Sequence, residues 1–181
     1  HFLSEVVGLK NRIAVTGEGG DSNGEDADGA AFRLRYNIPL NAPLVLFLGR
    51  KVFHKGITHV VEAMDRVWAV RSDACLVLMG FPHNPPSWLE GYLAKTRRGL
   101  SGRVVNIDNA SVSEREEALA ACTLMAAPSV GDSFGIVYLD AWRHKKPVVG
   151  CRRRAVNRLS VMAKTDGWLN SAILMKLPMR F

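Results

Sequence analysis

Five short apolar runs constrain the fold of this chain more than any other feature of its sequence. They are residues 44–48, 74–79, 103–107, 124–127 and 148–149. Four of them are apolar at every position, and 103–107 also contains Arg103 and Asn106, whereas a half-exposed strand would alternate apolar and polar residues throughout. Consecutive apolar residues are typical of strands that are buried on both faces of a parallel sheet. The five runs therefore predict five adjacent, mainly parallel strands.

Helical patterns separate these runs. From Ile57 to Trp68 apolar residues recur at three-four spacing, and Ser87 is a predicted N-cap for a helix over 88–98. Ser113, with Glu116 three residues later, matches a capping box that opens a helix to Ala121. Further helices are predicted over 30–36, as one or two turns, and over 134–144. Strand and helix alternate, so the predicted fold is α/β: a Rossmann-like, mostly parallel sheet with right-handed crossovers and helices on both faces.

The chain has 181 residues, of which 48% are hydrophobic and 23% charged, enough for one globular domain with a core. Residues 1–42 are interpreted as a lead-in or interdomain segment, partly flexible because 17–29 is dense in glycine and polar residues. The domain is expected over 43–156, followed by a divergent or truncated tail over 157–181. Because the first residue is His1, the sequence is expected to be a fragment.

Cysteine usage and hydropathy indicate the compartment. The three cysteines are odd in number and far apart, and two of them lie in apolar runs, which favours free thiols in a reducing cytoplasm. No apolar run approaches the roughly 20 residues that span a bilayer. No metal-ligand spacing is present in the sequence, so no metal site is predicted.

The formal net charge of +7 predicts affinity for an anion without naming it. Nucleic acid, anionic lipid head groups and nucleotide phosphates all fit this charge. The excess lies in short clusters at 97–98, 143–146 and 152–154, and no aromatic residues are interleaved with them as in a single-strand binding surface. Nucleic acid is therefore the least favoured of the three partners.

Residues 128–141 carry two carboxylates eight positions apart, Asp132 in a Gly/Ser turn and Asp140 in the apolar run that follows. A turn that opens a helix presents unpaired N–H groups, so the amides near 134–136 are expected to receive a phosphate or a sugar hydroxyl. Asp140 would reach a second group of the same ligand. The alternative is that Asp132 only caps the helix and Asp140 is a solvated helix residue.

The carboxyl ends of the predicted strands share a second property. Gly49-Arg50, Gly80, 106–109 and 129–132 each directly follow an apolar run. In open parallel sheets ligands bind beyond the carboxyl ends of the strands. These residues are therefore expected to line one site.

In three of these places the chain resembles the donor-binding half of the retaining GT-B glycosyltransferases of group 1. Gly49-Arg50 with Lys55-Gly56 is similar to the family's glycine-arginine, four residues, lysine-glycine element. Residues 76–80 are similar to its second strand. Residues 132–140 are similar to its pair of glutamates around a Phe-Gly-Ile-Val segment, although both glutamates are aspartates here. The three motifs agree in order and spacing over 43–151.

The resemblance implies a role for each matching residue. Arg50 and Lys55 would neutralise the diphosphate leaving group, and Asp132 would bind hydroxyls of the donor sugar. Asp140 would accept hydrogen bonds from the ribose. The other implied substrate contacts are Gly49, Gly80, Asn106, Ile107, Asp108, Ser133, Phe134, Gly135, Ile136 and Val137. The alternative for Arg50 and Lys55 is a solvated loop pair. Lys51 and His54 have no counterpart in the motif and are expected only to add to the local positive field.

The implied function is transfer of a sugar, with retention, from a UDP- or GDP-sugar to an acceptor sugar, lipid or small molecule bound by a separate N-terminal domain. No metal or other cofactor is implied, and the expected location is the cytoplasm, with peripheral membrane contact. Two other classes stay open from the residues alone. One is a non-catalytic or degenerate nucleotide-binding module, and the other is a basic interaction domain for anionic membranes or nucleic acid.

Overall fold

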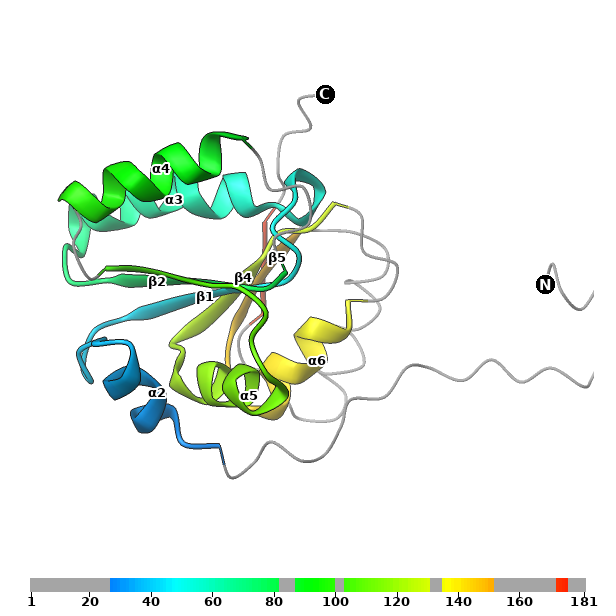
Figure 1. The fold of residues 1–181 in the computed structure, drawn as a ribbon. Helices are drawn as coiled ribbons and strands as arrows, with labels where there is room; N and C mark the ends of the chain where they lie inside the picture. The colour runs from blue at the N-terminus through cyan, green and yellow to red at the C-terminus, as the bar shows by residue number, and fades with distance from the viewer. Residues whose placement is uncertain (1–26, 82–86, 100–102, 131–134, 152–171, 176–181) are drawn as a thin grey trace, which may run out of the picture.

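The fold is a six-stranded sheet with helices on both faces (Figure 1). The computed structural model describes residues 27–81, 87–99, 103–130, 135–151 and 172–175. The strand order is β3-β2-β1-β4-β5-β6, and each neighbouring pair is parallel. The strands are β1 (Leu44–Leu48), β2 (Cys75–Met79), β3 (Val104–Ile107), β4 (Leu124–Ala127), β5 (Val148–Cys151) and β6 (Ala172–Met175). The predicted Rossmann-like α/β class and all five predicted strands are confirmed.

The order of the strands changes direction at β1. From β1 the chain adds β2 and β3 on one side, then returns to place β4 on the other, where Val45 lies opposite Leu124. In doubly wound sheets such a reversal opens a crevice at the carboxyl ends of the two central strands. The ligand site is therefore expected between the loops that follow β1 and β4.

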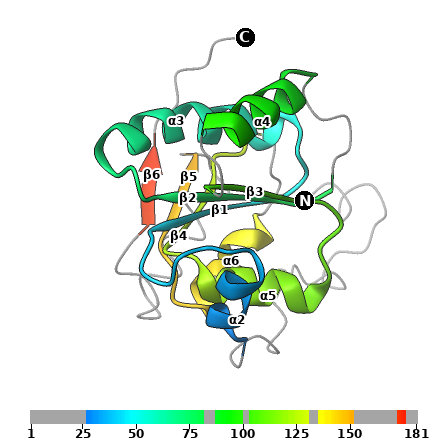
Figure 2. The same cartoon turned by 60° about the vertical axis from the view of Figure 1, so that its left-hand side comes forward.

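The helices form two layers. Helices α3 (Ile57–Val70) and α4 (Ser87–Gly99) cover one face of the sheet, and α2 (Gly29–Arg35), α5 (Val112–Ala121) and α6 (Ile136–Arg143) cover the other (Figure 2). A short 3-10 helix, η1 (Phe53–Lys55), precedes α3. The prediction of helices on both faces is confirmed.

Successive strand residues point into two different cores. Leu46 and Val77 belong to the core beneath α5 and α6, whereas Phe47 and Leu78 belong to the core beneath α3. All five residues of β2 are buried, because β2 lies between two strands and between two helical layers. Full burial of such side chains contributes about 1.5–3 kcal/mol each. This two-sided burial is why the apolar runs lack polar alternation.

Helix α2 and the loop after it belong to the same core. Asp28 Oδ1 accepts hydrogen bonds from the N–H groups of Ala30 (2.9 Å) and Ala31 (3.0 Å), and Phe32 is fully buried. The buried guanidinium of Arg33 donates to the carbonyl oxygens of Pro39, Ala42 and Ala121. Residues 28–42, which precede the first sheet strand, therefore pack as part of the domain.

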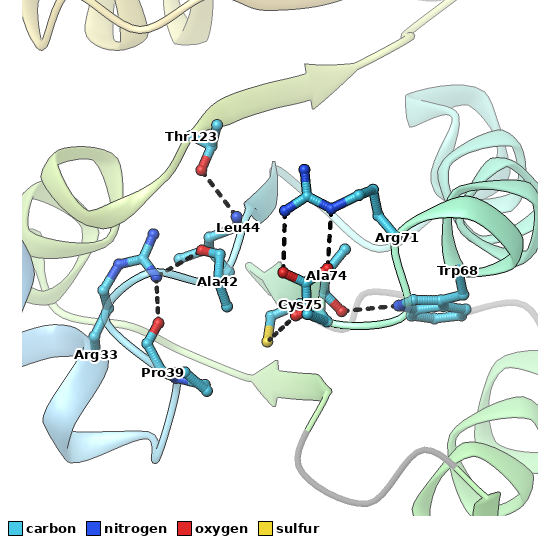
Figure 3. A network of polar contacts seen from close by, with 10 residues as sticks. Arg33, Pro39, Ala42, Leu44, Trp68, Arg71, Ala74, Cys75 and Thr123 are labelled. Carbon is cyan, nitrogen blue, oxygen red and sulfur yellow. Dashed lines mark hydrogen bonds and ion pairs between the residues drawn. The ribbon is translucent and has the colours of Figure 1, made fainter.

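Further hydrogen bonds tie the amino ends of the strands to neighbouring elements (Figure 3). Leu44 N–H donates to Thr123 Oγ1 at 2.9 Å, which joins the start of β1 to the loop before β4. The indole N–H of Trp68 donates to the carbonyl of Ala74 at 2.9 Å, which fixes the end of α3 at the start of β2.

Two details differ from the sequence predictions. The N-cap of α5 is Ser111, whose Oγ accepts from Glu114 N–H at 3.1 Å, so the predicted capping box at Ser113 and Glu116 is wrong by two residues. Strand β6 was not predicted, and it pairs with β5 from Val148 opposite Ala172 onward. The predicted helix over 134–144 is observed from Ile136 to Arg143, and its residue 134 lies outside the described residues.

All three cysteines are buried free thiols, including the two for which the apolar runs predicted this. Burial raises the pKa of the Cys122 thiol to about 11. In the part of the chain that the structure describes, no helix combines the length and the apolar character needed to cross a bilayer.

Candidate functional site

A pocket of about 600 Å³ lies at the carboxyl ends of β1, β2 and β4. Among the residues proposed from the sequence, it brings together Gly49, Arg50, Lys55, Gly80, Gly135, Ile136, Val137 and Asp140. Its wall also contains Asn109 and Ser129, which belong to the stretches expected at the strand ends, and three residues that the sequence did not single out, namely Phe81, Ala110 and Arg115. Asp132, Ser133 and Phe134 lie outside the described residues.

Direct contacts between the loops after β1 and β4 place Lys55 in this pocket. Val130 N–H donates to the carbonyl of His54 at 2.9 Å, and Ser129 Oγ donates to the same carbonyl at 3.3 Å. Gly56 has a φ of 80°, and a Cβ there would lie 2.4 Å from the carbonyl oxygen of Pro128. Only glycine permits this close approach at that φ. The backbone around Lys55 is therefore fixed against the segment that leads to α6.

Helix α6 points its amino end into the pocket. Gly135 is the N-cap residue, with no side-chain cap, and Gly135, Ile136 and Val137 all line the cavity. The first N–H groups of a helix lack intrahelical partners and carry the positive end of the helix dipole. Tyr138 is fully buried, and its hydroxyl donates to the carbonyl of Ala127 at 2.6 Å, which fixes α6 at the end of β4.

Arg50 and Lys55 line the same pocket as this helix terminus. Two cationic side chains and a row of backbone N–H groups thus face one space, although they come from segments about 80 residues apart. Such a set of donors suits a ligand with two adjacent anionic groups. Whether their nitrogen atoms face the amides of 134–135, as predicted, involves Phe134, which lies outside the described residues.

Asp140 is a buried carboxylate in the wall of the pocket. It is only 7% exposed, so it is not the solvated helix residue of the alternative interpretation. Burial raises the pKa of Asp140, while the positive charges of Arg115 and Arg143 oppose that rise. A carboxylate that is costly to bury and faces a cavity is available to accept hydrogen bonds from a ligand.

The three residues predicted near the base, 106–108, do not line the pocket but directly precede two residues that do. Asn106 and Ile107 belong to β3, and Ile107 is buried in the core. Neither they nor Asp108 line the cavity, whereas the next two residues, Asn109 and Ala110, do. The strand ends at Ile107, as predicted, and the chain enters the pocket wall only from Asn109 onward.

Lys51 accounts for the position of Asp108. Its side chain is 1% exposed, and its ammonium donates to the carbonyl of Ile107 at 2.8 Å and to the carboxylate of Asp108. Its backbone N–H donates to the carbonyl of Phe81 at 3.1 Å. Burial lowers the pKa of Lys51, and the bond to Asp108 opposes this shift. The prediction that Lys51 only adds to the local field is therefore wrong, because it joins the loops after β1, β2 and β3.

A second charged cluster lies where α5 meets α6. The buried carboxylate of Glu116 accepts from Arg143 Nη2 at 2.6 Å and from Arg115 Nη2 at 3.2 Å, and it lies 2.8 Å from His144 Nε2. Burial raises the pKa of Glu116, but the bonds from His144 and Arg143 outweigh it and hold that pKa below its usual value. The sequence contains no local signal for this cluster, because Glu116 lies 27 residues from Arg143 and 28 from His144.

The Rossmann-like fold and the pocket at its strand ends belong to a known family. The chain matches the model described as glycosyl transferases group 1 over residues 42–172. This match covers well over half of the sequence, so the chain belongs to the group 1 glycosyltransferases. The resemblance stated from the three sequence motifs is confirmed at the level of this family.

Two characterised relatives resemble this chain over only part of their own length. The D-inositol 3-phosphate glycosyltransferase of Corynebacterium glutamicum is 28% identical over 149 residues, which cover 78% of this chain and 36% of that protein. The alpha-maltose-1-phosphate synthase of Mycobacterium tuberculosis is 33% identical over 104 residues, which cover 56% of this chain and 26% of that protein. The chain therefore spans about a third of the length of these relatives.

Solved structures share the fold. HepE of Anabaena, in complex with UDP-glucose, has a TM-score of 0.63 at 23% identity, over 78% of this chain and 39% of that one. The C-terminal domain of the group 1 glycosyltransferase LpcC from Francisella tularensis has a TM-score of 0.62 at 20% identity, over 76% of this chain and 72% of that one. The second likeness is to a single domain of comparable extent.

Proposed function

We propose that this chain is the nucleotide-sugar-binding domain of a retaining glycosyltransferase. The observation that carries the proposal is the single pocket in which Arg50 and Lys55 face the amino end of α6, with Asp140 in the same wall. Membership of the group 1 family and the UDP-glucose bound by HepE support it. The acceptor is proposed to bind to a separate domain, with the reaction taking place between the two.

Arg50 and Lys55 are assigned to the donor diphosphate. As the bond to the sugar breaks, negative charge develops on the leaving diphosphate, and fixed cations lower the energy of that state. The N–H groups at Gly135 and Ile136 are assigned to the same phosphates. In this proposal the positive charge is supplied by side chains and the helix terminus, and the assignment includes no metal ion.

The rest of the donor is assigned to the two ends of the pocket. Asp140 accepts hydrogen bonds from the ribose, and the base lies against Asn109 and Ala110 in place of residues 106–108. Asp132 is assigned to hydroxyls of the donor sugar, with the Ser133 and Phe134 backbone beside it, all on the basis of the motif alone. Retention is tested with the full-length enzyme, by reading the anomeric configuration of its product with NMR.

Loss of either cation should weaken nucleotide binding. We expect Arg50→Met and Lys55→Met each to raise the Kd of a nucleoside diphosphate by roughly ten- to a hundredfold, the effect of losing a charged hydrogen bond. The measurement is calorimetric titration of UDP, GDP and ADP into the 181-residue chain and its variants. Arg71→Met is the control, because Arg71 is paired with Asp73 just before β2, away from the pocket.

The same titration separates the other functional classes. A binder driven by charge alone would take inorganic diphosphate and heparin as well as any nucleotide, without a preferred base, and its affinity would fall steeply with salt. That outcome would refute the donor-site proposal. A degenerate module would bind a nucleotide normally, and the full-length protein would transfer no sugar.

Asp140→Ala should weaken the nucleotide while leaving the fold intact. We expect a loss of roughly 1.5–3 kcal/mol in binding free energy, because a hydrogen bond to a charged group is removed. Asp140→Glu, which restores the longer side chain of the family motif, should bind at least as well as wild type. The measurement is calorimetric titration beside a melting curve for each variant. Unchanged affinity with a lowered melting temperature in the alanine variant would show that Asp140 is only structural.

A further inference from the structure

Two side chains of opposite charge face the pocket from different helices. Arg115 comes from the first turns of α5, and Asp140 comes from α6. Their charges attract, and Arg115 is the strongest favourable charge on the Asp140 carboxylate. The proposed function assigns a role to Asp140 only, so the cation beside it has none.

The guanidinium of Arg115 is bound by the carboxylate of Glu116. Its Nη2 donates to Glu116 Oε1 at 3.2 Å, and the other carboxylate oxygen of Glu116 is held by Arg143 and His144. Glu116 on α5, and Arg143 and His144 at the carboxyl end of α6, are the other charged or titratable groups that act on Asp140. Of this cluster, only Arg115 lines the cavity.

Arg115 and Asp140 each have hydrogen-bonding capacity to spare. Arg115 Nε is buried and has no hydrogen-bond acceptor among the residues that the structure describes. Among the described residues, the Asp140 carboxylate has no hydrogen-bond donor among the causes of its pKa shift. The shift comes from burial and from neighbouring charges. Buried polar groups are rarely left without partners in native structures. A ligand group that both donates and accepts would satisfy the two together.

We propose that Arg115 is a second ribose-binding residue, which donates to the hydroxyl oxygens while Asp140 accepts their protons. This inference rests on the proposed function. A guanidinium only donates and a carboxylate only accepts, whereas each hydroxyl of a vicinal diol does both. A phosphate in this position would be repelled by Asp140, and a base carbonyl would satisfy only Arg115. The ribose diol, which the proposed function already places at Asp140, matches both side chains.

The test compares a ribonucleotide with its 2′,3′-dideoxy counterpart. The nucleoside diphosphate that binds best among UDP, GDP and ADP is titrated, with and without its ribose hydroxyls, into wild type and Arg115→Met. We expect Arg115→Met to weaken the ribonucleotide roughly ten- to a hundredfold and the dideoxynucleotide less than about threefold. The wild-type preference for the ribonucleotide should therefore largely disappear in the variant.

Arg66→Met is the control, because Arg66 is an exposed arginine of α3, on the other face of the sheet. It should leave both affinities unchanged. Should Arg115→Met not fold, Arg115→Gln, which retains a donor toward Glu116, takes its place in the same comparison. Wild-type affinity for the ribonucleotide, or an equal loss for both ligands, would overturn the role of Arg115 alone. Failure of the wild-type chain to bind any nucleotide would overturn the proposed function as well.

Discussion

Replacing Glu116 with glutamine should destabilise the domain by roughly 3–5 kcal/mol, the range for removing one partner of a buried ion pair. The carboxylate is 7% exposed and is bound by Arg115, Arg143 and His144, so its loss leaves two guanidinium groups next to each other without their shared anion. At about 2–4 °C per kcal/mol for a chain of this size, the melting temperature should fall by roughly 6–20 °C. Denaturant titration and thermal melting followed by circular dichroism measure the two quantities.

The neighbouring substitution Glu117→Gln is the matched control. Glu117 pairs with Arg35 at 2.6 Å in a pair that is open to solvent on the arginine side, so its loss should change stability far less. The deficit of Glu116→Gln should also depend on pH. The pKa of Glu116 is lowered by folding, so its stabilisation is complete above the unfolded value of about 4.5 and is lost as the pH falls through the folded pKa. A deficit that grew on acidification would contradict this assignment.

Gly80→Ala should destabilise the domain by about 3 kcal/mol or more. Gly80 has a φ of 140°, and a Cβ at this position would lie 2.1 Å from the carbonyl oxygen of Gly49. The variant would combine a strained backbone with overpacking of one loop against another, each of which costs about 1–3 kcal/mol. Because both glycines line the pocket, nucleotide affinity should fall together with stability. Denaturant titration and calorimetry on the same preparation measure both effects.

Gly91→Ala is the matched control, because the same glycine-to-alanine change should stabilise the domain at this position. Gly91 lies within α4, and a Cβ there would meet no atom within 4 Å. Alanine in a helix interior is favoured over glycine by roughly 0.5–1 kcal/mol, so this variant should be slightly more stable than wild type. Equal stability of Gly80→Ala and wild type would show that the two loops can separate without cost.

The strands could be predicted because their burial is reflected in short runs of neighbouring residues. Strands β1, β2, β4 and β5 are buried along most of their length, so their residues are apolar one after another. Two of the five predicted starts were early by one residue. Strand β6 escaped prediction because it lies in the stretch interpreted as a divergent or truncated tail, residues 157–181. Arg50 and Lys55 could be found because they directly follow a predicted strand in a recognisable motif.

The interactions that tune the site could not be read from the sequence. Ser111 with Glu114 and Ser113 with Glu116 both fit a capping box, and local spacing does not choose between them. The choice depends on Glu116, whose partners Arg143 and His144 lie on another helix. Lys51 is a comparable case, because its acceptors are 56 and 57 residues away. Only the fold brings such groups together.

The ammonium of Lys51 gives one side of the pocket a fixed shape before any ligand arrives. Phe81, joined to the Lys51 backbone, and Asn109, next to the carboxylate that Lys51 binds, both line the cavity. Moving these walls apart would require a buried charge to give up its acceptors, which is energetically costly. Little conformational freedom is then lost here when a nucleotide binds. Under the proposed assignment of the base to Asn109 and Ala110, a base would be accepted or rejected by its fit to this wall, so that discrimination between purine and pyrimidine would belong to the folded domain itself.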